Sequence, residues 1–284
     1  MPELPEVEVL VRHLSPLLKN KTVRRVEVRR TKVLSPTTPR QLSRALLGAR
    51  FVGVSRRGKY LLFSLRRSGR RNPLLLLGHL GMTGRIYLQA QSHALPRHVA
   101  VIFDLGKVNL IYEDTRYFGR MTLDTSGLAK LGPEPLAADF TVADFALALK
   151  RSSQAIKVKL LDQSLVVGVG NIYASEALFR AGISPRLAAR RLTRKQIERL
   201  WRAIRAVLSE AIEQGSTVPL DWVGTGKQNG LFYYGQAADA PDFYEERLLV
   251  YDRQGKPCSN CGTSIKRFVQ ASRSTFYCPC CQCG

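Results

Sequence analysis

The cysteines of this chain of 284 residues all lie after residue 257, and their spacing restricts what the end of the chain can fold into. Cys258 and Cys261 form one Cys-x2-Cys pair, and Cys278 and Cys281 form another, with residues 262–277 between them. This spacing is typical of a tetrahedral zinc site with four thiolate ligands. Four protein ligands leave no open coordination position. The spacing therefore predicts one structural Zn²⁺ and a small module built around it.

The exact set of ligands is open at this point. Cys280 and Cys283 form a second, overlapping Cys-x2-Cys pair, and spacing alone does not choose between it and the pair that begins at Cys278. Lysine, arginine and phenylalanine residues lie between the first pair and the last. A zinc-held hairpin that carries such cations is suited to grip phosphate groups.

The other end of the chain offers an unusual nucleophile. If Met1 is removed, Pro2 carries a free secondary amine, and α-amino groups have a pKa of about 8. Such an amine can attack a carbonyl-like carbon and hold it as an iminium, as lysine does in Schiff-base enzymes. Glu3 and Glu6 are near enough in sequence to move protons. The alternative is that Pro2 and Pro5 only begin a helix.

The charge of the chain narrows the class of partner. Lys and Arg number 44 against 22 Asp and Glu, which gives a net charge of +22. This excess favours a polyanionic partner, nucleic acid before an anionic membrane. No uninterrupted apolar run approaches the ~18 residues of a membrane helix, and no signal peptide is recognisable. We therefore expect a cytoplasmic protein.

The pattern of apolar residues divides the chain. Apolar residues at helical spacing predict a helix over 5–19. From 22 to 125 short β-rich runs alternate with turns, which favours a β-sandwich or barrel. The expected strands are 23–28, 51–54, 60–65, 74–77, 85–89, 99–103 and 108–112.

A Gly-Pro-Glu-Pro stretch at 132–135 predicts a linker, and helices follow it. We expect them at 142–149, around 156–161, over 172–181 with Asn171 as the N-cap, and over 193–214. Thr193 and Gln196 make a capping-box pattern at the start of the last helix. Residues 216–247 have little periodicity.

Several loops carry candidate DNA contacts. Lys59 follows a turn, where it either reaches a phosphate or is simply solvated. Met82 lies in a glycine-rich loop and is either a core residue or a wedge between base steps. Arg116 and Phe118 are two residues apart, hence on one side of an extended strand. The segment 168–171, before a helix, can offer backbone N–H groups to an anion.

Together these features resemble the formamidopyrimidine-DNA glycosylase and endonuclease VIII family of base-excision repair enzymes. The resemblance spans the chain. It rests on residues 1–8 (MPELPEVE), 58–61 (GKYL), 79–84 (HLGMTG), Arg116 with 118–119, 131–136 (LGPEPL), 168–176, and the terminal Cys278-Pro279-x-Cys281-Gln282.

The resemblance implies an α+β multidomain fold with DNA between the domains. A β-sandwich catalytic domain that begins with the N-terminal helix would span 1–130, with a linker and first helix at 131–150. A helix-two-turn-helix domain with a lesion-covering loop would span 151–247, and the zinc finger 248–284. The partner would be double-stranded DNA containing a damaged base or abasic site, and the protein would act as a monomer on the bacterial nucleoid.

The resemblance also assigns roles. Pro2 would attack the sugar C1′ of a flipped nucleotide, Glu3 would donate a proton and Glu6 would support the site. Elimination would then cut the strand on both sides. Lys59, Lys157, Asn171 and Arg273 would hold phosphates, and His79 would lie near the backbone. Met82, Arg116 and Phe118 would fill the void and meet the orphaned base. The ligands of the single Zn²⁺ would be Cys258, Cys261, Cys278 and Cys281.

Within the family, Leu4 and the complete Met-Arg-Phe set indicate the branch that excises oxidised purines such as 8-oxoguanine. Tyr117 stands where the family usually has Arg, and Ser272 replaces a Gly. Residues 236–246 look like an insertion. The alternatives are endonuclease VIII-like specificity for oxidised pyrimidines and a non-catalytic DNA-binding zinc protein.

Overall fold

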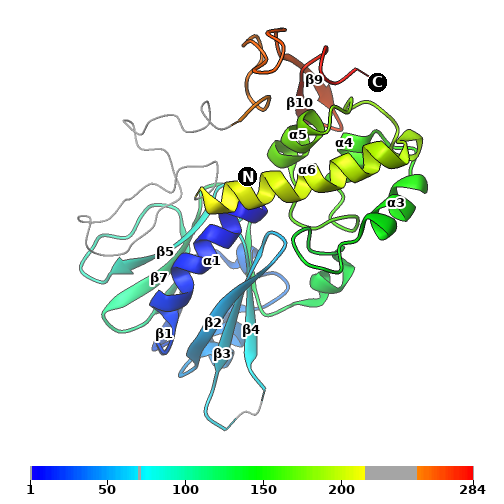
Figure 1. The fold of residues 1–284 in the computed structure, drawn as a ribbon. Coiled ribbons are helices and arrows are strands. Elements are labelled where there is room, and N and C mark those ends of the chain that lie inside the picture. The colour runs from blue at the N-terminus through cyan, green and yellow to red at the C-terminus, as the bar shows by residue number, and fades with distance from the viewer. Residues whose placement is uncertain (1, 70–71, 215–247, 284) are drawn as a thin grey trace. The chain divides into compact units, whose positions relative to one another are not determined.

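The computed structural model describes residues 2–69, 72–214 and 248–283 (Figure 1). The chain divides into two compact units. In the described part, the first comprises Pro2 and residues 6–129, and the second comprises Glu3 to Pro5, residues 130–214 and 248–283. The stretch 216–247, which has little periodicity in the sequence, lies outside the described residues. It includes the insertion expected at 236–246. No helix in the described ranges is long and apolar enough to cross a membrane.

The first unit is a β-sandwich of two four-stranded antiparallel sheets. The strand orders are β1-β6-β7-β5 and β2-β3-β4-β8. In β3, Leu61, Phe63 and Leu65 are buried and alternate with less buried residues, as expected for a strand with one face on the core. The strands are β1 (Arg25–Val28), β2 (Arg50–Arg57), β3 (Tyr60–Arg66), β4 (Leu74–His79), β5 (Gly84–Ala90), β6 (Val99–Asp104), β7 (Val108–Asp114) and β8 (Arg120–Thr122).

Helix α1 (Leu4–Leu18) supplies one apolar stripe to the sandwich core, as its sequence period predicts. Val7, Leu10, Leu14 and Leu18 are buried in the same cluster as residues of both sheets. A periodicity of this kind forms a helix because burying one face offsets the entropy of ordering it.

A second helix in this unit, α2 (Pro39–Leu46), was not expected from the β-rich pattern. Thr38 and Gln41 form a complete capping box, and Pro39 occupies the first turn. These are recognisable start signals for a helix, so the sequence carried the information. The 3-10 turns η1 (Thr31–Leu34) and η2 (Ser126–Lys130) complete the unit.

The second unit combines helices with a β-hairpin. Its helices are α3 (Val142–Lys150), α4 (Ile156–Leu160), α5 (Asn171–Arg180) and α6 (Arg194–Glu213), with the 3-10 turn η3 (Ala189–Arg191). Thr193 and Gln196 form the expected capping box of α6. The hairpin strands β9 (Lys266–Gln270) and β10 (Arg273–Tyr277) are antiparallel, and β10 lies against α5 (Figure 1).

Candidate active site and nucleic-acid interface

The amino end of helix α5 holds the Glu3 carboxylate. Glu3 is only 1% exposed, and its oxygens accept hydrogen bonds from the backbone N–H groups of Ile172, at 2.9 Å, and Tyr173, at 3.4 Å. The first N–H groups of a helix lack partners within the helix and carry its positive end. The anion that the sequence predicted at this helix end is therefore the chain's own carboxylate.

Two glycines before α5 permit this approach. A Cβ atom on Gly170 would lie 2.3 Å from the Glu3 carboxyl carbon, and one on Gly168 would lie 2.6 Å from the Leu4 side chain. Gly168 also has a φ of +88°, and its carbonyl accepts the Leu4 N–H at 3.1 Å. The Gly-x-Gly motif thus serves close packing against residues 3–4.

The prediction that Asn171 caps α5 is wrong. Gly170 is the N-cap, and Asn171 is the first helical residue. Its side-chain amide instead donates to the Ser274 carbonyl at 3.0 Å. A glycine N-cap leaves the end of the helix open for a side chain from elsewhere, and here Glu3 takes that place.

Lys157 reaches the same strand as Asn171. Its Nζ donates to the Ser274 carbonyl and to Thr275 Oγ1, both at 2.8 Å. The side chain is 1% exposed, and burial together with the nearby Arg273 lowers its pKa to about 7, although Glu3 acts in the opposite direction. Arg273 itself is exposed. The structure therefore brings the three predicted phosphate ligands of this unit together around the start of β10.

In the first unit, Pro2, Glu6 and Lys59 are all buried. Lys59 lies in the tight turn between β2 and β3, beside Gly58 with φ +55°, and it is only 7% exposed. A solvated turn lysine would be far more exposed, so that alternative is excluded. A buried ammonium group at the tip of a turn makes Lys59 a candidate for a functional role.

His79 lies close to Lys59 and is kept neutral. Burial, with the charges of Lys59 and Arg120, lowers the pKa of His79 to about 4. Its Nδ1 accepts the backbone N–H of Gly81 at 3.2 Å. A neutral imidazole has one donor and one acceptor nitrogen, so Nε2 carries the proton. His79 can therefore donate a hydrogen bond to a phosphate oxygen near neutral pH without carrying a charge.

Met82, Arg116 and Phe118 form one exposed cluster. Arg116 Nη1 lies 3.6 Å from the Met82 sulfur, and the guanidinium carbon lies 4.8 Å from the centre of the Phe118 ring. Met82 is 39% exposed and Phe118 is 49% exposed, which excludes the core alternative for Met82.

The extended-strand geometry predicted for this segment is wrong. β7 ends at Asp114, and Tyr117 has a φ of +53°. Arg116 and Phe118 are side by side because of this loop conformation. Tyr117 itself receives a hydrogen bond from Arg30 Nε at 3.1 Å.

The zinc module groups four of the six cysteines. The sulfurs of Cys258, Cys261, Cys278 and Cys281 all lie within 4.8 Å of one another, and Cys280 and Cys283 are outside this group. The separations are 3.9 Å for Cys258–Cys281 and 3.5 Å for Cys261–Cys278. Tetrahedral Zn–S bonds of about 2.3 Å put sulfurs about 3.8 Å apart. This set therefore fits one structural Zn²⁺, with no position left for a substrate.

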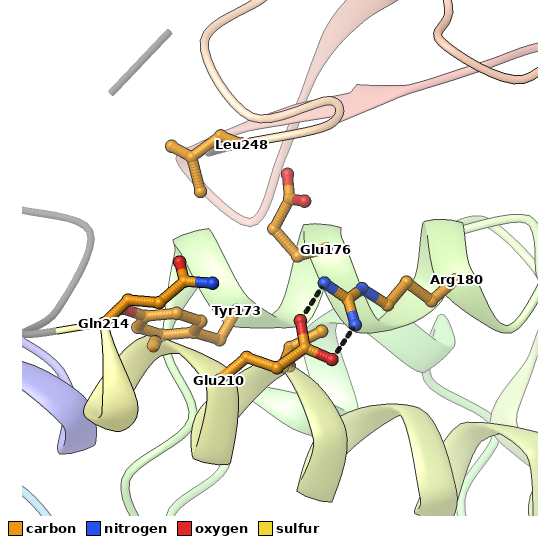
Figure 2. A pocket seen from close by; sticks show the side chains of 8 residues that line it. Tyr173, Glu176, Arg180, Glu210, Gln214 and Leu248 are labelled. Atoms are coloured by element: carbon orange, nitrogen blue, oxygen red, sulfur yellow. Dashed lines mark hydrogen bonds and ion pairs between the residues drawn. The ribbon is translucent and has the colours of Figure 1, made fainter. Parts of the chain in front are cut away.

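A buried carboxylate that the sequence reasoning missed anchors this module. Glu176 on α5 accepts the backbone N–H groups of Leu249, Val250 and Tyr251 at 2.9 to 3.0 Å. Figure 2 shows its carboxylate pointing towards the segment that begins at Leu248. Glu176 belongs to the 168–176 motif, but its partners are residues 249–251. The spacing of residues within the motif could not predict contacts so far along the chain.

The pocket drawn in Figure 2 has a volume of about 30 Å³, enough for one water molecule. Beside Glu176, Arg180 donates to both carboxylate oxygens of Glu210 at 2.6 and 2.5 Å. This bidentate pair links α5 to α6. The pocket is too small for a base or a sugar, so we assign it a structural role only.

Comparisons with known proteins agree with this arrangement. Residues 1–121 match the model of the formamidopyrimidine-DNA glycosylase N-terminal domain, residues 131–220 that of its H2TH domain, and residues 255–282 that of the zinc finger found in FPG and IleRS. The chain therefore belongs to the formamidopyrimidine-DNA glycosylase family, within the α+β fold that these three modules define.

A formamidopyrimidine-DNA glycosylase from Desulfitobacterium hafniense is 39% identical over 289 residues, which covers 99% of this chain and all of the relative. The Lactococcus lactis enzyme in complex with Fapy-dG-containing DNA aligns with a TM-score of 0.86 at 32% identity, over 99% of this chain and 100% of that one. MutM in complex with DNA containing carbocyclic 8-oxo-G aligns at 0.84 and 30% identity over the full length of both chains.

Proposed function

We propose that this chain is a bifunctional DNA glycosylase and AP lyase that excises oxidised purines, including 8-oxoguanine and formamidopyrimidines, from double-stranded DNA. The proposal is supported most by one observation, the full-length family match of a chain that begins Met-Pro-Glu. Relatives of similar length are named formamidopyrimidine-DNA glycosylase, and two aligned proteins are bound to DNA that contains carbocyclic 8-oxo-G or Fapy-dG.

The first chemical step assigned to the site is attack by the Pro2 nitrogen on C1′ of the damaged nucleotide. The N–C1′ bond forms as the glycosidic bond breaks, and the departing base takes up a proton. The Glu3 carboxylate takes the proton that the attacking nitrogen loses and passes it to the ring oxygen of the sugar, which opens the ring and leaves an iminium. The α5 hydrogen bonds fix the orientation of the Glu3 carboxyl, next to Pro2 in sequence. Glu6 would support this site.

Elimination completes the reaction. Loss of a C2′ proton from the iminium expels the 3′ phosphate, and loss of a C4′ proton then expels the 5′ phosphate. Hydrolysis of the iminium then returns the amine. All of these steps are proton transfers and bond cleavages, so they consume no oxidant. A zinc ion held by Cys258, Cys261, Cys278 and Cys281 would cross-link the C-terminal module next to the end of β10.

The remaining site residues would bind the DNA. Lys59, Lys157, Asn171 and Arg273 are assigned to phosphates, and His79 to a phosphate through its Nε2 proton. Met82, Arg116 and Phe118 would fill the void left by the flipped nucleotide. The proposed domains span 1–130, 131–150, 151–247 and 248–284, with the lesion-covering loop in the third. We expect the enzyme to act on nucleoid DNA.

Borohydride trapping tests the proposal. It reduces an iminium between protein and DNA to a stable bond. Wild type and Pro2→Gly would be compared on duplexes with 8-oxoguanine, an oxidised pyrimidine or an abasic site, after intact mass shows that Met1 is absent. We expect an adduct on 8-oxoguanine that falls at least about 100-fold in the variant, since the glycine amine is a poorer and more mobile nucleophile.

The other outcomes separate the rival functions. An adduct mainly on the pyrimidine lesion would assign the chain to the endonuclease VIII branch. No adduct on any duplex would favour a non-catalytic DNA-binding protein. A wild-type preparation that is active although every molecule retains Met1 would exclude Pro2 as the nucleophile.

A further inference from the structure

We propose that Asp114 is a positioning residue that joins two loops into one void-filling unit, a proposal that rests on the function proposed above. Asp114 is the last residue of β7 and is fully buried. It is not one of the proposed DNA contacts. One loop, between β4 and β5, carries Met82. The other, between β7 and β8, carries Arg116 and Phe118. The Asp114 carboxylate accepts hydrogen bonds from both loops.

Three donors converge on this carboxylate, and the Tyr112 hydroxyl lies beside it. Thr83 Oγ1 donates to Oδ1 at 2.6 Å, and the Arg116 backbone N–H donates to the same oxygen at 3.1 Å. The Gly119 N–H donates to Oδ2 at 2.8 Å, and the Tyr112 hydroxyl lies 3.5 Å from that oxygen. Thr83 Oγ1 also accepts the Arg116 N–H at 3.2 Å. The residues beside Met82 and on both sides of Phe118 are therefore fixed to one buried group.

The two loops approach too closely for side chains to separate them. A Cβ on Gly81 would lie 2.6 Å from the Gly119 nitrogen, and a Cβ on Gly119 would lie 1.8 Å from the Tyr112 hydroxyl. Gly81 also has a φ of +60°. Tyr112 in addition donates to the carbonyl of His79 at 3.3 Å. The contact therefore continues from the void-filling cluster to the histidine assigned to phosphate.

A carboxylate accepts at both oxygens, whereas an asparagine would turn its NH₂ group towards one of the two backbone donors, the N–H of Arg116 or that of Gly119. A buried donor without an acceptor is costly, so the loops would move apart to reach water. Because Arg116 is assigned to the orphaned base, a shift of its loop alters how the enzyme distinguishes the base opposite the lesion. It leaves Pro2 and Glu3 untouched.

The test uses Asp114→Asn in single-turnover excision of 8-oxoguanine opposite cytosine and opposite adenine. We expect the ratio of the two rate constants to change by about fivefold or more relative to wild type. Loss of folded enzyme cannot produce this result, because it lowers both rates by the same factor. Borohydride trapping on a duplex that already contains an abasic site should stay within about twofold per active molecule.

Two further variants make the test decisive. Thr83→Val removes one donor without changing the shape, and it should move the ratio in the same direction if Asp114→Asn folds poorly. Asp104→Asn is the matched control, a carboxylate of the same unit that accepts from Gln91 and Gly106 at 2.7 Å, and it should leave the ratio unchanged.

An unchanged ratio in both Asp114→Asn and Thr83→Val would overturn the positioning role. A wild-type enzyme that excises 8-oxoguanine from neither duplex would instead contradict the proposed function. The Asp114 proposal would then be tested by the fluorescence of 2-aminopurine opposite an abasic analogue. That signal reports stacking on the inserted side chains, and it should differ between wild type and Asp114→Asn. Equal fluorescence of the two proteins would overturn the proposal.

Discussion

At the residue scale, buried charged groups in this chain organise the backbone. Glu3 binds the amino end of α5, Glu176 binds three N–H groups of residues 249–251, and Asp114 holds two loops. Carboxylates are suited to this work because they accept several hydrogen bonds at once. Lys157 is the cationic counterpart, with its Nζ bound to a carbonyl and a hydroxyl of β10.

The shifted pKa of Lys157 predicts a pH effect on stability. The pKa is about 7 in the folded chain, against about 10.4 for an unfolded lysine. Between these values the unfolded chain binds a proton that the folded chain has lost, so stability rises with pH across this window. From about pH 7 to about pH 9.5 the gain is at most about 3 kcal/mol.

Lys157→Met should remove this gain, because methionine has a similar length and does not titrate. Urea unfolding at the two pH values, for wild type and variant, measures it. The relevant quantity is the change in unfolding free energy of the wild type minus that of the variant. An equal pH response in the two proteins would show that Lys157 keeps its ordinary pKa.

At the element scale, the β9–β10 hairpin carries an unusual turn. Ala271 has a φ of +47° and Ser272 a φ of +58°, and the register pairs Gln270 with Arg273. A two-residue turn of this kind requires positive φ at both central positions and favours Asn-Gly or Gly-Gly. This chain instead places two residues with side chains in the left-handed region, which costs about 1 to 2 kcal/mol each.

Ser272→Gly should therefore stabilise the zinc module by about 1 kcal/mol. Thermal unfolding of the zinc-loaded protein gives the measurement. Ser259→Gly is the control, at an exposed position of the same module whose φ is not positive. It should be neutral or slightly destabilising, since glycine there only adds freedom to the unfolded chain. A lower melting temperature for Ser272→Gly would contradict the assigned turn strain.

At the scale of the whole molecule, the excess of cations dominates. The net charge of +22 is spread over both units, and it attracts DNA irrespective of sequence. Affinity of this kind depends on the counterions released from DNA. The lesion spectrum, in contrast, depends on a few side chains. Charge and specificity are therefore separable in experiment.

Salt dependence measures the cationic contacts. Two of the proposed phosphate contacts, Lys59 and Arg273, contribute about −1.8 to the slope of log affinity against log salt, which is about a twelvefold fall in affinity from 50 to 200 mM salt. Arg273→Gln should make the slope shallower by about 0.9.

Arg199→Gln is the matched control for Arg273→Gln. Arg199 is an exposed cation on α6, outside the proposed contacts. Its replacement should leave the slope unchanged. Equal slopes for wild type and Arg273→Gln, in titrations of a lesion duplex, would remove Arg273 from the phosphate contacts.

The sequence alone determined the features that depend on neighbours in the chain. Four such features are the apolar stripe of α1, the capping box of α6, the alternation in β3 and the cysteine spacing. Each follows from the local geometry of a helix, a strand or a metal-binding turn. The capping box of α2 was equally local, and only the surrounding β pattern hid it. The family resemblance came from motifs that are likewise continuous in sequence.

Tertiary structure decided which groups meet across long distances in the chain. Glu3 binds residues 172 and 173, and Lys157 binds residue 274. Asp114 joins Thr83 to Gly119. The Asn171 cap and the extended form of residues 116–118 were predicted wrongly for the same reason. A side chain chooses its partner by distance and by what burial leaves unsatisfied, and neither quantity is a property of local sequence.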